Sequence, residues 1–232
     1  MPLKIQKLKK SKKLKESSKR WILRQLNDPF VEQARMEGWR SRAAYKILEV
    51  DEKFKIFKKG KFVVDLGAAP GGWSQVAAKK VGSRNVLGID LLEISPVPDV
   101  KFIQLDFLAD DAHELIISEI KELKKHSHNP NQSSYADVIL TDMAANTTGD
   151  KRTDHARIIG LLEESLFLAE KILNNGGCFV GKIFQGGSSD EIVKTLRKSF
   201  KTVKYFKPKS SRQDSAETYL VAMDFANKEE KI

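Results

Sequence analysis

Short apolar runs alternate along the chain with longer segments whose apolar residues have helical spacing. Five runs of strand length stand at residues 61–67, 85–91, 100–107, 136–144 and 176–184. Four segments with a helical period stand among them, at residues 72–80, 112–125, 154–173 and 189–200. Strands that are apolar along their whole length are typical of a sheet buried on both faces, so the alternation predicts an α/β fold with a mainly parallel sheet.

The last two predicted strands are connected differently from the others. Residues 201–207 and 216–225 are joined by the short loop 208–215, which leaves no room for a helix. A parallel crossover needs a dozen or more residues, so this pair is expected to be antiparallel. The sequence therefore predicts a doubly wound, mostly parallel seven-stranded sheet with a C-terminal antiparallel strand. Such a sheet differs from the usual dinucleotide-binding fold and is typical of Rossmann-like, S-adenosylmethionine-dependent methyltransferases.

Positive charge is concentrated at the N-terminus. Residues 1–20 contain nine Lys or Arg and one acid, Glu16, and so carry +8 of the formal net charge of +10. Such a block repels itself, is expected to be disordered alone, and suits a polyanionic partner; the alternative is a tail that only aids solubility. Residues 21–232 are expected to form a single domain with an N-terminal helical extension, broken near Pro29 and Gly38. Ser41 is the expected N-cap of the helix that carries Lys46.

Several classes of protein and site are disfavoured by composition. No apolar stretch has the length of a signal-peptide core behind the basic tail or of a membrane span, so a cytoplasmic protein is expected. The single cysteine, Cys178, rules out an internal disulfide and a cysteine-rich zinc site. His113, His126, His128 and His155 lack the spacing of metal ligands, so no metal is expected. No heptad or apolar edge predicts self-association, and a monomer is expected.

A glycine-rich turn follows the first predicted strand, in the segment FVVDLGAAPGGWSQV at residues 62–76. Gly67 and Gly72 have the spacing of the outer glycines of a dinucleotide fingerprint, but Ala69 stands where that fingerprint needs a glycine for the pyrophosphate. Trp73 would place an indole where a phosphate needs helix amides. The turn is therefore expected to bind a nucleoside without a pyrophosphate, and a dehydrogenase is disfavoured.

Four predicted strands finish on an acid, at Asp65, Asp90, Asp106 and Asp142. Ligands of open α/β sheets lie outside the carboxyl ends of the strands, so these carboxylates are expected to ring one site. By position, Asp90 suits ribose hydroxyls, Asp106 an adenine amino group, and Asp142 a methionyl amine or the reacting group. S-adenosylmethionine fits, because it carries a sulfonium and an ammonium and no phosphate. The alternative is that the acids only cap turns, and it is strongest for Asp65.

Two lysines and a glutamate add chemistry near this edge. Lys182 interrupts the apolar strand FVGKIF, where a charge is costly unless it is paired, so it is a candidate catalytic residue; the alternative is a lysine whose stem lets the charge reach solvent. Lys46, in SRAAYKILEV, and Glu217, in SAETYLV, are ambiguous when each is taken alone.

Five separated segments together resemble the FtsJ/RrmJ family of large-subunit ribosomal RNA 2′-O-ribose methyltransferases. They are SRAAYKI, VDLGAAPGGWSQ, TDMAAN, GKIFQG and KPKSSRQDSAETYLVA, in a match that runs from Trp21 to Phe225. The resemblance implies a catalytic set of Lys46, Asp142, Lys182 and Glu217. It implies S-adenosylmethionine contacts at Gly71, Trp73, Asp90, Asp106 and Asp142.

The resemblance also implies a substrate and partners. The expected acceptor is a uridine ribose of 23S-type RNA in the assembled or nearly assembled large subunit, with no metal and no protein partner required. Lys182 would act either as a neutral base or as a charged group that orients the hydroxyl. RNA phosphates are expected to contact the tail and a set of basic residues: Arg20, Arg24, Arg40, Arg42, Lys209 and Arg212.

One residue departs from the family pattern, and two other functions compete. Ala145 stands where the family usually has proline, so the loop after Asp142 lacks the rigidity that a proline gives.

The alternative functions are a 2′-O-methyltransferase of tRNA or of an mRNA cap, and an RNA-binding ribosome-assembly factor without chemistry. The full set of lysines and acids counts against the second.

Overall fold

The computed structural model describes residues 16–82, 84–125, 135–144, 149–184, 189–212 and 215–226. The expectations about residues 1–15, His126, His128 and Ala145 lie outside the described residues.

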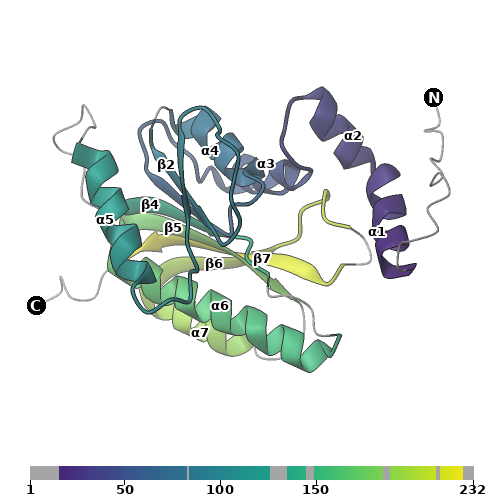
Figure 1. The fold of residues 1–232 in the computed structure, drawn as a ribbon. Coiled ribbons are helices and arrows are strands. Elements are labelled where there is room, and N and C mark those ends of the chain that lie inside the picture. The colour runs from purple at the N-terminus through teal and green to yellow at the C-terminus, as the bar shows by residue number, and fades with distance from the viewer. Residues whose placement is uncertain are drawn as a thin grey trace, which may run out of the picture.

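A seven-stranded sheet forms the centre of the molecule (Figure 1), with the strand order β3-β2-β1-β4-β5-β7-β6. Its strands are β1 Val63–Leu66, β2 Val86–Asp90, β3 Val100–Gln104, β4 Ala136–Thr141, β5 Leu173–Phe184, β6 Phe200–Phe206 and β7 Glu217–Phe225. The pairs from β3 through β5 are parallel, and β7 lies antiparallel between β5 and β6. The predicted sheet, with its antiparallel C-terminal strand, is confirmed.

Helices cover both faces of this sheet. They are α1 Glu16–Leu26, α2 Pro29–Met36, α3 Ala43–Phe54, α4 Gly72–Val81, α5 Ala112–Lys125, α6 Lys151–Ile172 and α7 Ser189–Ser199. One apolar cluster joins α3 and α4 to the sheet, and a second joins α5, α6 and α7 to it. None of the helices within the described ranges is both long enough and apolar enough to cross a membrane.

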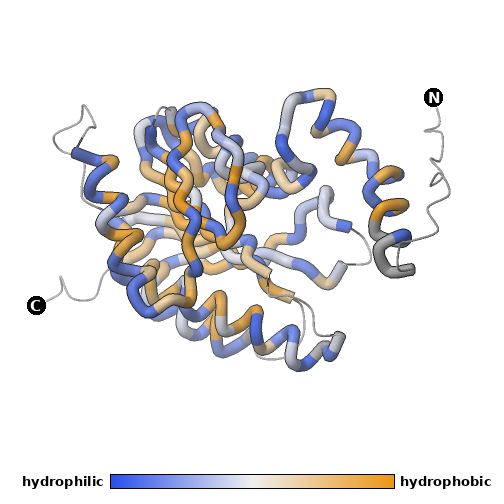
Figure 2. Tube along the Cα trace, in the orientation of Figure 1, coloured by the Kyte–Doolittle hydropathy of each residue, from blue (hydrophilic) through white to orange (hydrophobic). Residues whose placement is uncertain are grey.

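The alternation of side chains along the strands explains these two clusters. In β1, Val63 belongs to the α3–α4 cluster, whereas Val64 belongs to the other. Successive side chains of a strand point to opposite faces, and both faces here are buried, so the strands read as continuous apolar runs. Figure 2 shows the hydrophobic positions gathered along the sheet and on the helix sides turned toward it.

The N-terminal extension is broken near Pro29 and near Gly38, as expected, because α1 ends at Leu26, α2 spans Pro29–Met36 and α3 begins at Ala43. Pro29 is the first residue of α2, and Asp28 caps that helix by accepting a hydrogen bond from Phe30 N. The prediction of Ser41 as the N-cap of α3 is wrong, because Arg42 holds the cap position without a side-chain hydrogen bond. The Ser41 hydroxyl instead packs against Gly72, where a Cβ would lie 2.4 Å from Ser41 Oγ. Helix α1 begins at Glu16, inside the segment assigned to the tail.

Candidate active site

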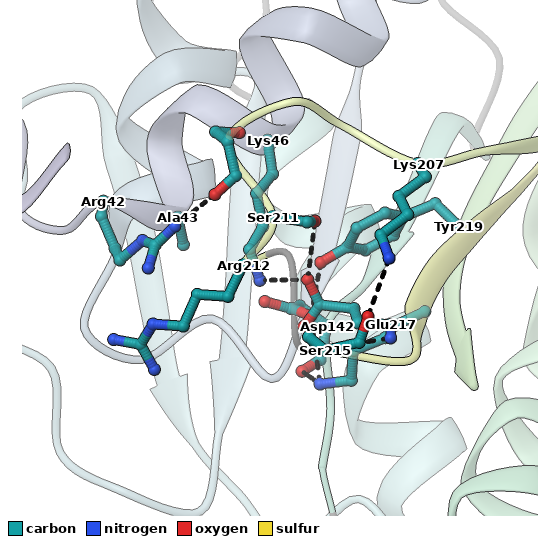
Figure 3. A network of polar contacts seen from close by, with 12 residues as sticks. Arg42, Ala43, Lys46, Asp142, Lys207, Ser211, Arg212, Ser215, Glu217 and Tyr219 are labelled. Atoms are coloured by element: carbon teal, nitrogen blue, oxygen red, sulfur yellow. Dashed lines mark hydrogen bonds and ion pairs between the residues drawn. The ribbon is translucent and has the colours of Figure 1, made fainter. Parts of the chain in front are cut away.

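Four elements bring the four predicted catalytic residues together at the carboxyl edge of the sheet. Lys46 comes from the second turn of α3, Asp142 directly follows β4, Lys182 lies near the end of β5, and Glu217 opens β7. Because β7 runs antiparallel to β5, its first residue lies opposite Phe184, at the edge where the parallel strands end. Figure 3 shows Lys46, Asp142 and Glu217 around the ring of Tyr219.

Lys182 and Asp142 form the first of two ion pairs at this edge. Lys182 Nζ donates a hydrogen bond of 2.6 Å to the carbonyl oxygen of Asp142 and lies 3.1 Å from its Oδ1. The hydroxyl of Tyr219, directly opposite Lys182 across the β5–β7 ladder, donates to the same Oδ1 at 3.1 Å. The Lys182 side chain is only 7% exposed. The alternative of a lysine that reaches solvent therefore does not hold.

Lys46 and Glu217 form the second ion pair. Lys46 Nζ lies 2.7 Å from Glu217 Oε1, and the Ser211 hydroxyl donates to the same oxygen at 3.0 Å. The Lys46 ammonium is also 5.8 Å from the centroid of the Tyr219 ring. Tyr219 thus contacts a member of each pair and links them into one network.

The network fixes the protonation state of two of its members. Burial by itself would raise the pKa of Asp142, but the positive charges of Lys182 and Lys46 and the hydrogen bonds from Lys182 and Tyr219 hold that pKa below its usual value. Burial, followed by the charge of Asp142, raises the pKa of Tyr219 well above its usual value. At neutral pH Asp142 is therefore a carboxylate and Tyr219 a hydrogen-bond donor.

The glycine-rich turn lies between β1 and α4, next to this network. Gly67 and Gly71 have φ values of +76° and +101°, which favour glycine. Asp90 supports the turn, since its Oδ2 accepts a hydrogen bond from Ala69 N and its Oδ1 one from Leu92 N, both at 2.8 Å. These bonds show that Asp90 orders the backbone, and each of its oxygens has a further lone pair for a ligand.

Comparison with known proteins identifies the family. A family model described as FtsJ-like methyltransferase matches residues 39–225, which include the turn and the four residues of the two ion pairs.

The chain belongs to the FtsJ-like methyltransferase family.

Relatives along nearly the whole chain agree with this. The Ribosomal RNA large subunit methyltransferase E of Xanthobacter autotrophicus is 49% identical, over 97% of this chain and 85% of that protein. The protein of the same name from Rickettsia bellii is 49% identical, over 95% of each chain. A crystal structure from Plasmodium falciparum, assigned as a ribosomal RNA methyltransferase, is 31% identical and has a TM-score of 0.70, covering 82% of this chain and all of that one.

Asp65 does not reach the site that this FtsJ-like methyltransferase presents at the sheet edge. It lies inside β1, is 1% exposed, and accepts a hydrogen bond of 2.6 Å from the Ser74 hydroxyl. Burial, with contributions from Asp142 and Asp90, raises the pKa of Asp65 to about 7. Asp65 therefore has no place in the expected ring of acids, and the alternative of a structural role is correct for this residue.

Asp106 lies beyond the end of its strand. Strand β3 ends at Gln104, and Asp106 Oδ1 accepts a hydrogen bond of 3.0 Å from Leu108 N in the next turn. The side chain thus orders the turn after β3, as Asp90 orders the turn after β2.

Trp73 has a different role from the one its position suggested. Its indole is 3% exposed, donates a hydrogen bond of 2.8 Å to the carbonyl of Ala43, and packs 5.5 Å from the ring of Tyr219. The expectation of an indole in place of a bound phosphate is therefore wrong. The side chain joins α4 to α3 and β7, and a ligand contact from this residue would come from its backbone.

Two arginines expected to contact RNA are bound within the protein. The Arg40 guanidinium donates to backbone carbonyls of the turn and of the β2–β3 connection, with Nη1 2.7 Å from Ser95 O and 3.3 Å from Pro70 O. Arg42 donates to Asp28 and to the carbonyl of Ser210. Arg40 thus clamps the turn to the approach to α3, and Arg42 clamps α3 to the β6–β7 loop.

The sequence reasoning missed two residues of the network, Tyr219 and Ser211. A period of two along β7 places Tyr219 on the same side of the strand as Glu217, and that spacing was the available signal. Ser211 had no comparable signal, since its contact with Glu217 depends on how the β6–β7 loop folds back. In the described part of the chain, no three His, Cys, Asp or Glu side chains gather as a metal site.

Proposed function

We propose that this chain transfers the methyl group of S-adenosylmethionine to the 2′-hydroxyl of a uridine ribose in large-subunit ribosomal RNA. The observation that carries the proposal is the joining of the Lys182–Asp142 and Lys46–Glu217 pairs through Tyr219. The names of the relatives from Xanthobacter and Rickettsia support ribosomal RNA as the acceptor.

The chemistry of the turn suits the proposed methyl donor. Its glycines carry no side chains that could block the backbone. Gly71 also has little room for one, since a Cβ there would lie 3.3 Å from both Arg40 Cδ and Phe102 Cζ. The carboxylates of Asp90, Asp106 and Asp142 suit a ligand that carries an ammonium and a sulfonium and no phosphate. We assign cofactor binding to these three side chains and to the backbone at Gly71 and Trp73.

The residues of the network would align the acceptor oxygen and manage its proton. S-adenosylmethionine supplies a methyl group already activated on sulfur, so alignment is the larger task for the protein. Two of the three donors of an ammonium on Lys182 would be directed at Asp142, which leaves one for the 2′-oxygen. We assign to Lys182 the contact with the reacting hydroxyl, and to Asp142 and Tyr219 the placement of Lys182. Lys46 and Glu217 would hold the ribose from the α3 side.

A pH–rate profile separates the two roles open to Lys182. As a neutral amine it accepts the hydroxyl proton, and the single-turnover rate rises with pH along an ionisation that Lys182→Arg removes. As an ammonium it orients the oxygen and stabilises the emerging alkoxide while water takes the proton, and the same ionisation then lowers the rate as pH rises.

Basic residues left available for RNA phosphates differ from those expected. Arg24 and Lys209 are exposed, and Arg212 is half-buried beside the site, with Nε and Nη2 directed at Asp28, so that Nη1 would face an RNA. We assign phosphate contacts to these three and to the lysines of residues 1–15, and not to Arg40 or Arg42. Such contacts orient an RNA without reading its sequence.

The proposal is tested with S-adenosylmethionine radiolabelled in the methyl group. Large ribosomal subunits that lack ribose methylation, tRNA and capped mRNA are offered separately to the wild-type protein. A 2′-O-methyl group blocks alkaline cleavage of its own linkage, so label should appear in an alkali-resistant dinucleotide from the large subunit. Label in tRNA or in the cap alone would assign another acceptor. Bound cofactor without transfer to any RNA would favour the assembly factor.

A further inference from the structure

One face of α3 carries three charged residues that all meet the C-terminal part of the chain. Arg42 is followed by Lys46 and Glu49 at four and seven residues, the spacing of one helix face. Lys46 points into the candidate active site, as described above. The Glu49 carboxylate accepts hydrogen bonds from the backbone N–H groups of Lys209 at 2.6 Å and Ser210 at 2.8 Å. Helix α3 therefore binds both the site and the loop between β6 and β7.

Asp28, ahead of α2, ties this loop down from a second side. Its Oδ2 accepts from Arg42 Nη1, and Arg212 Nε and Nη2 both lie 3.3 Å from the same oxygen. The other guanidinium nitrogen of Arg42 donates to the carbonyl of Ser210. The Asp28 side chain is 7% exposed. One buried carboxylate thus holds the arginine that caps α3 and an arginine of the loop.

The Asp28 carboxylate compensates the positive charges of Arg42 and Arg212. Burial lowers the pKa of Arg42, Asp28 opposes that shift, and the neighbouring charge of Arg212 adds to it. Removal of the carboxylate charge would leave two guanidinium groups of like charge facing each other, and the side chain of Arg42 is only 13% exposed. An uncompensated charge in such a place is strongly unfavourable, so the loop is expected to move away from α3.

Movement of this loop would reach the ion pair of the site through Ser211. Ser211 is 6% exposed, and its hydroxyl donates to Glu217 Oε1, the oxygen that also pairs with Lys46. Without that hydrogen bond, the Glu217 carboxylate loses one of the groups that fix its orientation.

We propose that Asp28 is a positioning residue for methyl transfer, which holds the β6–β7 loop on α3 so that Ser211 fixes Glu217 against Lys46. The inference rests on the proposed function, since it concerns the geometry of the same site. It assigns a role in the reaction to a residue of the N-terminal extension that precedes the matched family region.

The kinetic test compares Asp28→Asn with Asp137→Asn. Asn keeps the shape and the cap acceptor of Asp28 and removes its charge. Asp137 is a matched control, because its carboxylate is also about 10% exposed and pairs with Lys61 at 2.8 Å, at the start of β4 and far from the site. We expect kcat to fall about tenfold in Asp28→Asn, with KM for S-adenosylmethionine unchanged, as for one lost charge-assisted contact. A kcat equal to that of Asp137→Asn would overturn the proposal.

A double-mutant cycle tests the route of the effect. If Asp28 acts through Ser211, the change Asp28→Asn should lower kcat far less in a Ser211→Ala background than in the wild type. If Asp28→Asn acted only through a general loss of stability, it would lower kcat by the same factor in both backgrounds. That result would contradict the proposal.

Hydrogen exchange tests, without any RNA substrate, whether Asp28 holds the β6–β7 loop on α3. Amide exchange of residues 207–212 should be faster in Asp28→Asn than in the wild type and in Asp137→Asn. Unchanged exchange overturns the inference even if the wild-type protein methylates RNA. A wild-type protein that methylates no RNA, with faster exchange in Asp28→Asn, overturns the proposed function and keeps the loop attachment.

Discussion

Each of the two acids of the candidate active site places a lysine and a hydroxyl on one carboxylate oxygen. Asp142 Oδ1 lies 3.1 Å from both Lys182 Nζ and the Tyr219 hydroxyl, and Glu217 Oε1 binds Lys46 and the Ser211 hydroxyl. A carboxylate held by two donors loses rotational freedom, and the lysine it binds is fixed with it. This arrangement supplies the preorganisation that alignment of a ribose oxygen requires.

Sequence reasoning succeeds for residues whose type conflicts with their surroundings. Lys182 was recognisable because a charge interrupts an apolar strand, and the structure shows it buried and paired. Tyr219 was not, since a tyrosine in a strand is ordinary in a core. Asp65 was expected at the site because it ends a strand, but it points into the protein, as does the Trp73 indole. Position along the chain gives the edge of the sheet, whereas packing decides which way each side chain points.

Asp65 makes stability depend on pH in a defined direction. Its pKa is about 7 in the folded state against an ordinary value of 3.8, so between those values the folded protein keeps a proton that the unfolded chain loses. The free energy of unfolding should therefore fall as pH rises through this window, by up to about 1.4 kcal/mol per pH unit. Asp65→Asn removes this contribution and keeps an acceptor for Ser74.

Urea denaturation of the wild type and of Asp65→Asn at pH 5, 6 and 7 checks this sign. Groups that titrate alike in both proteins cancel in the difference. The stability of Asp65→Asn relative to the wild type should rise from pH 5 to pH 7, and a difference that stays constant would show that Asp65 is already ionised in the folded protein.

At the scale of elements, the sequence predicted connections better than helix ends. The short loop before β7 was enough to predict an antiparallel strand, because chain length limits the possible crossovers. The cap of α3 was missed because Ser41 follows the capping pattern, whereas its side chain is needed against Gly72. The attachment of the β6–β7 loop to α3 was also missed, since it joins residues more than 150 positions apart.

The turn between β1 and α4 offers a test of close packing near the site. A Cβ at Gly67 would lie 2.6 Å from Met143 Cγ and 3.0 Å from the Met143 backbone, next to Asp142. Gly82, at the end of α4, also has a positive φ, but a Cβ there meets nothing within 4 Å. Gly82→Ala should cost about 1–3 kcal/mol through the backbone conformation alone. Gly67→Ala should cost about 1–3 kcal/mol more, because Met143 must move.

Urea midpoints of the two variants measure this difference, and binding of S-adenosylmethionine shows its effect on the site. We expect Gly67→Ala to weaken cofactor binding and Gly82→Ala to leave it unchanged. Equal losses of stability in the two proteins would mean that Met143 yields without cost.

At the scale of the whole molecule, charge and chemistry are separated along the chain. Residues 1–20 hold +8 of the net charge of +10, while the site is built from the carboxyl edge of the sheet with α3 and the β6–β7 loop. A strongly basic N-terminus ahead of a nearly neutral body suits a polyanionic partner that the folded part then modifies. The sequence sufficed for the sheet and for the family resemblance. It did not suffice for the joining of the N-terminal extension to the C-terminal loop, which depends on tertiary packing.

The most direct test of the central claim is the single-turnover rate of methyl transfer in Lys182→Ala, with Lys61→Ala as the control. Lys61 also pairs with a carboxylate, that of Asp137, but at the opposite edge of the sheet. Large subunits lacking ribose methylation serve as acceptor, and S-adenosylmethionine affinity is measured for each protein. We predict that Lys182→Ala binds the cofactor normally and transfers at least about 100-fold more slowly, as expected for loss of a group acting on the reacting proton. Transfer by Lys182→Ala at the rate of Lys61→Ala would contradict the account.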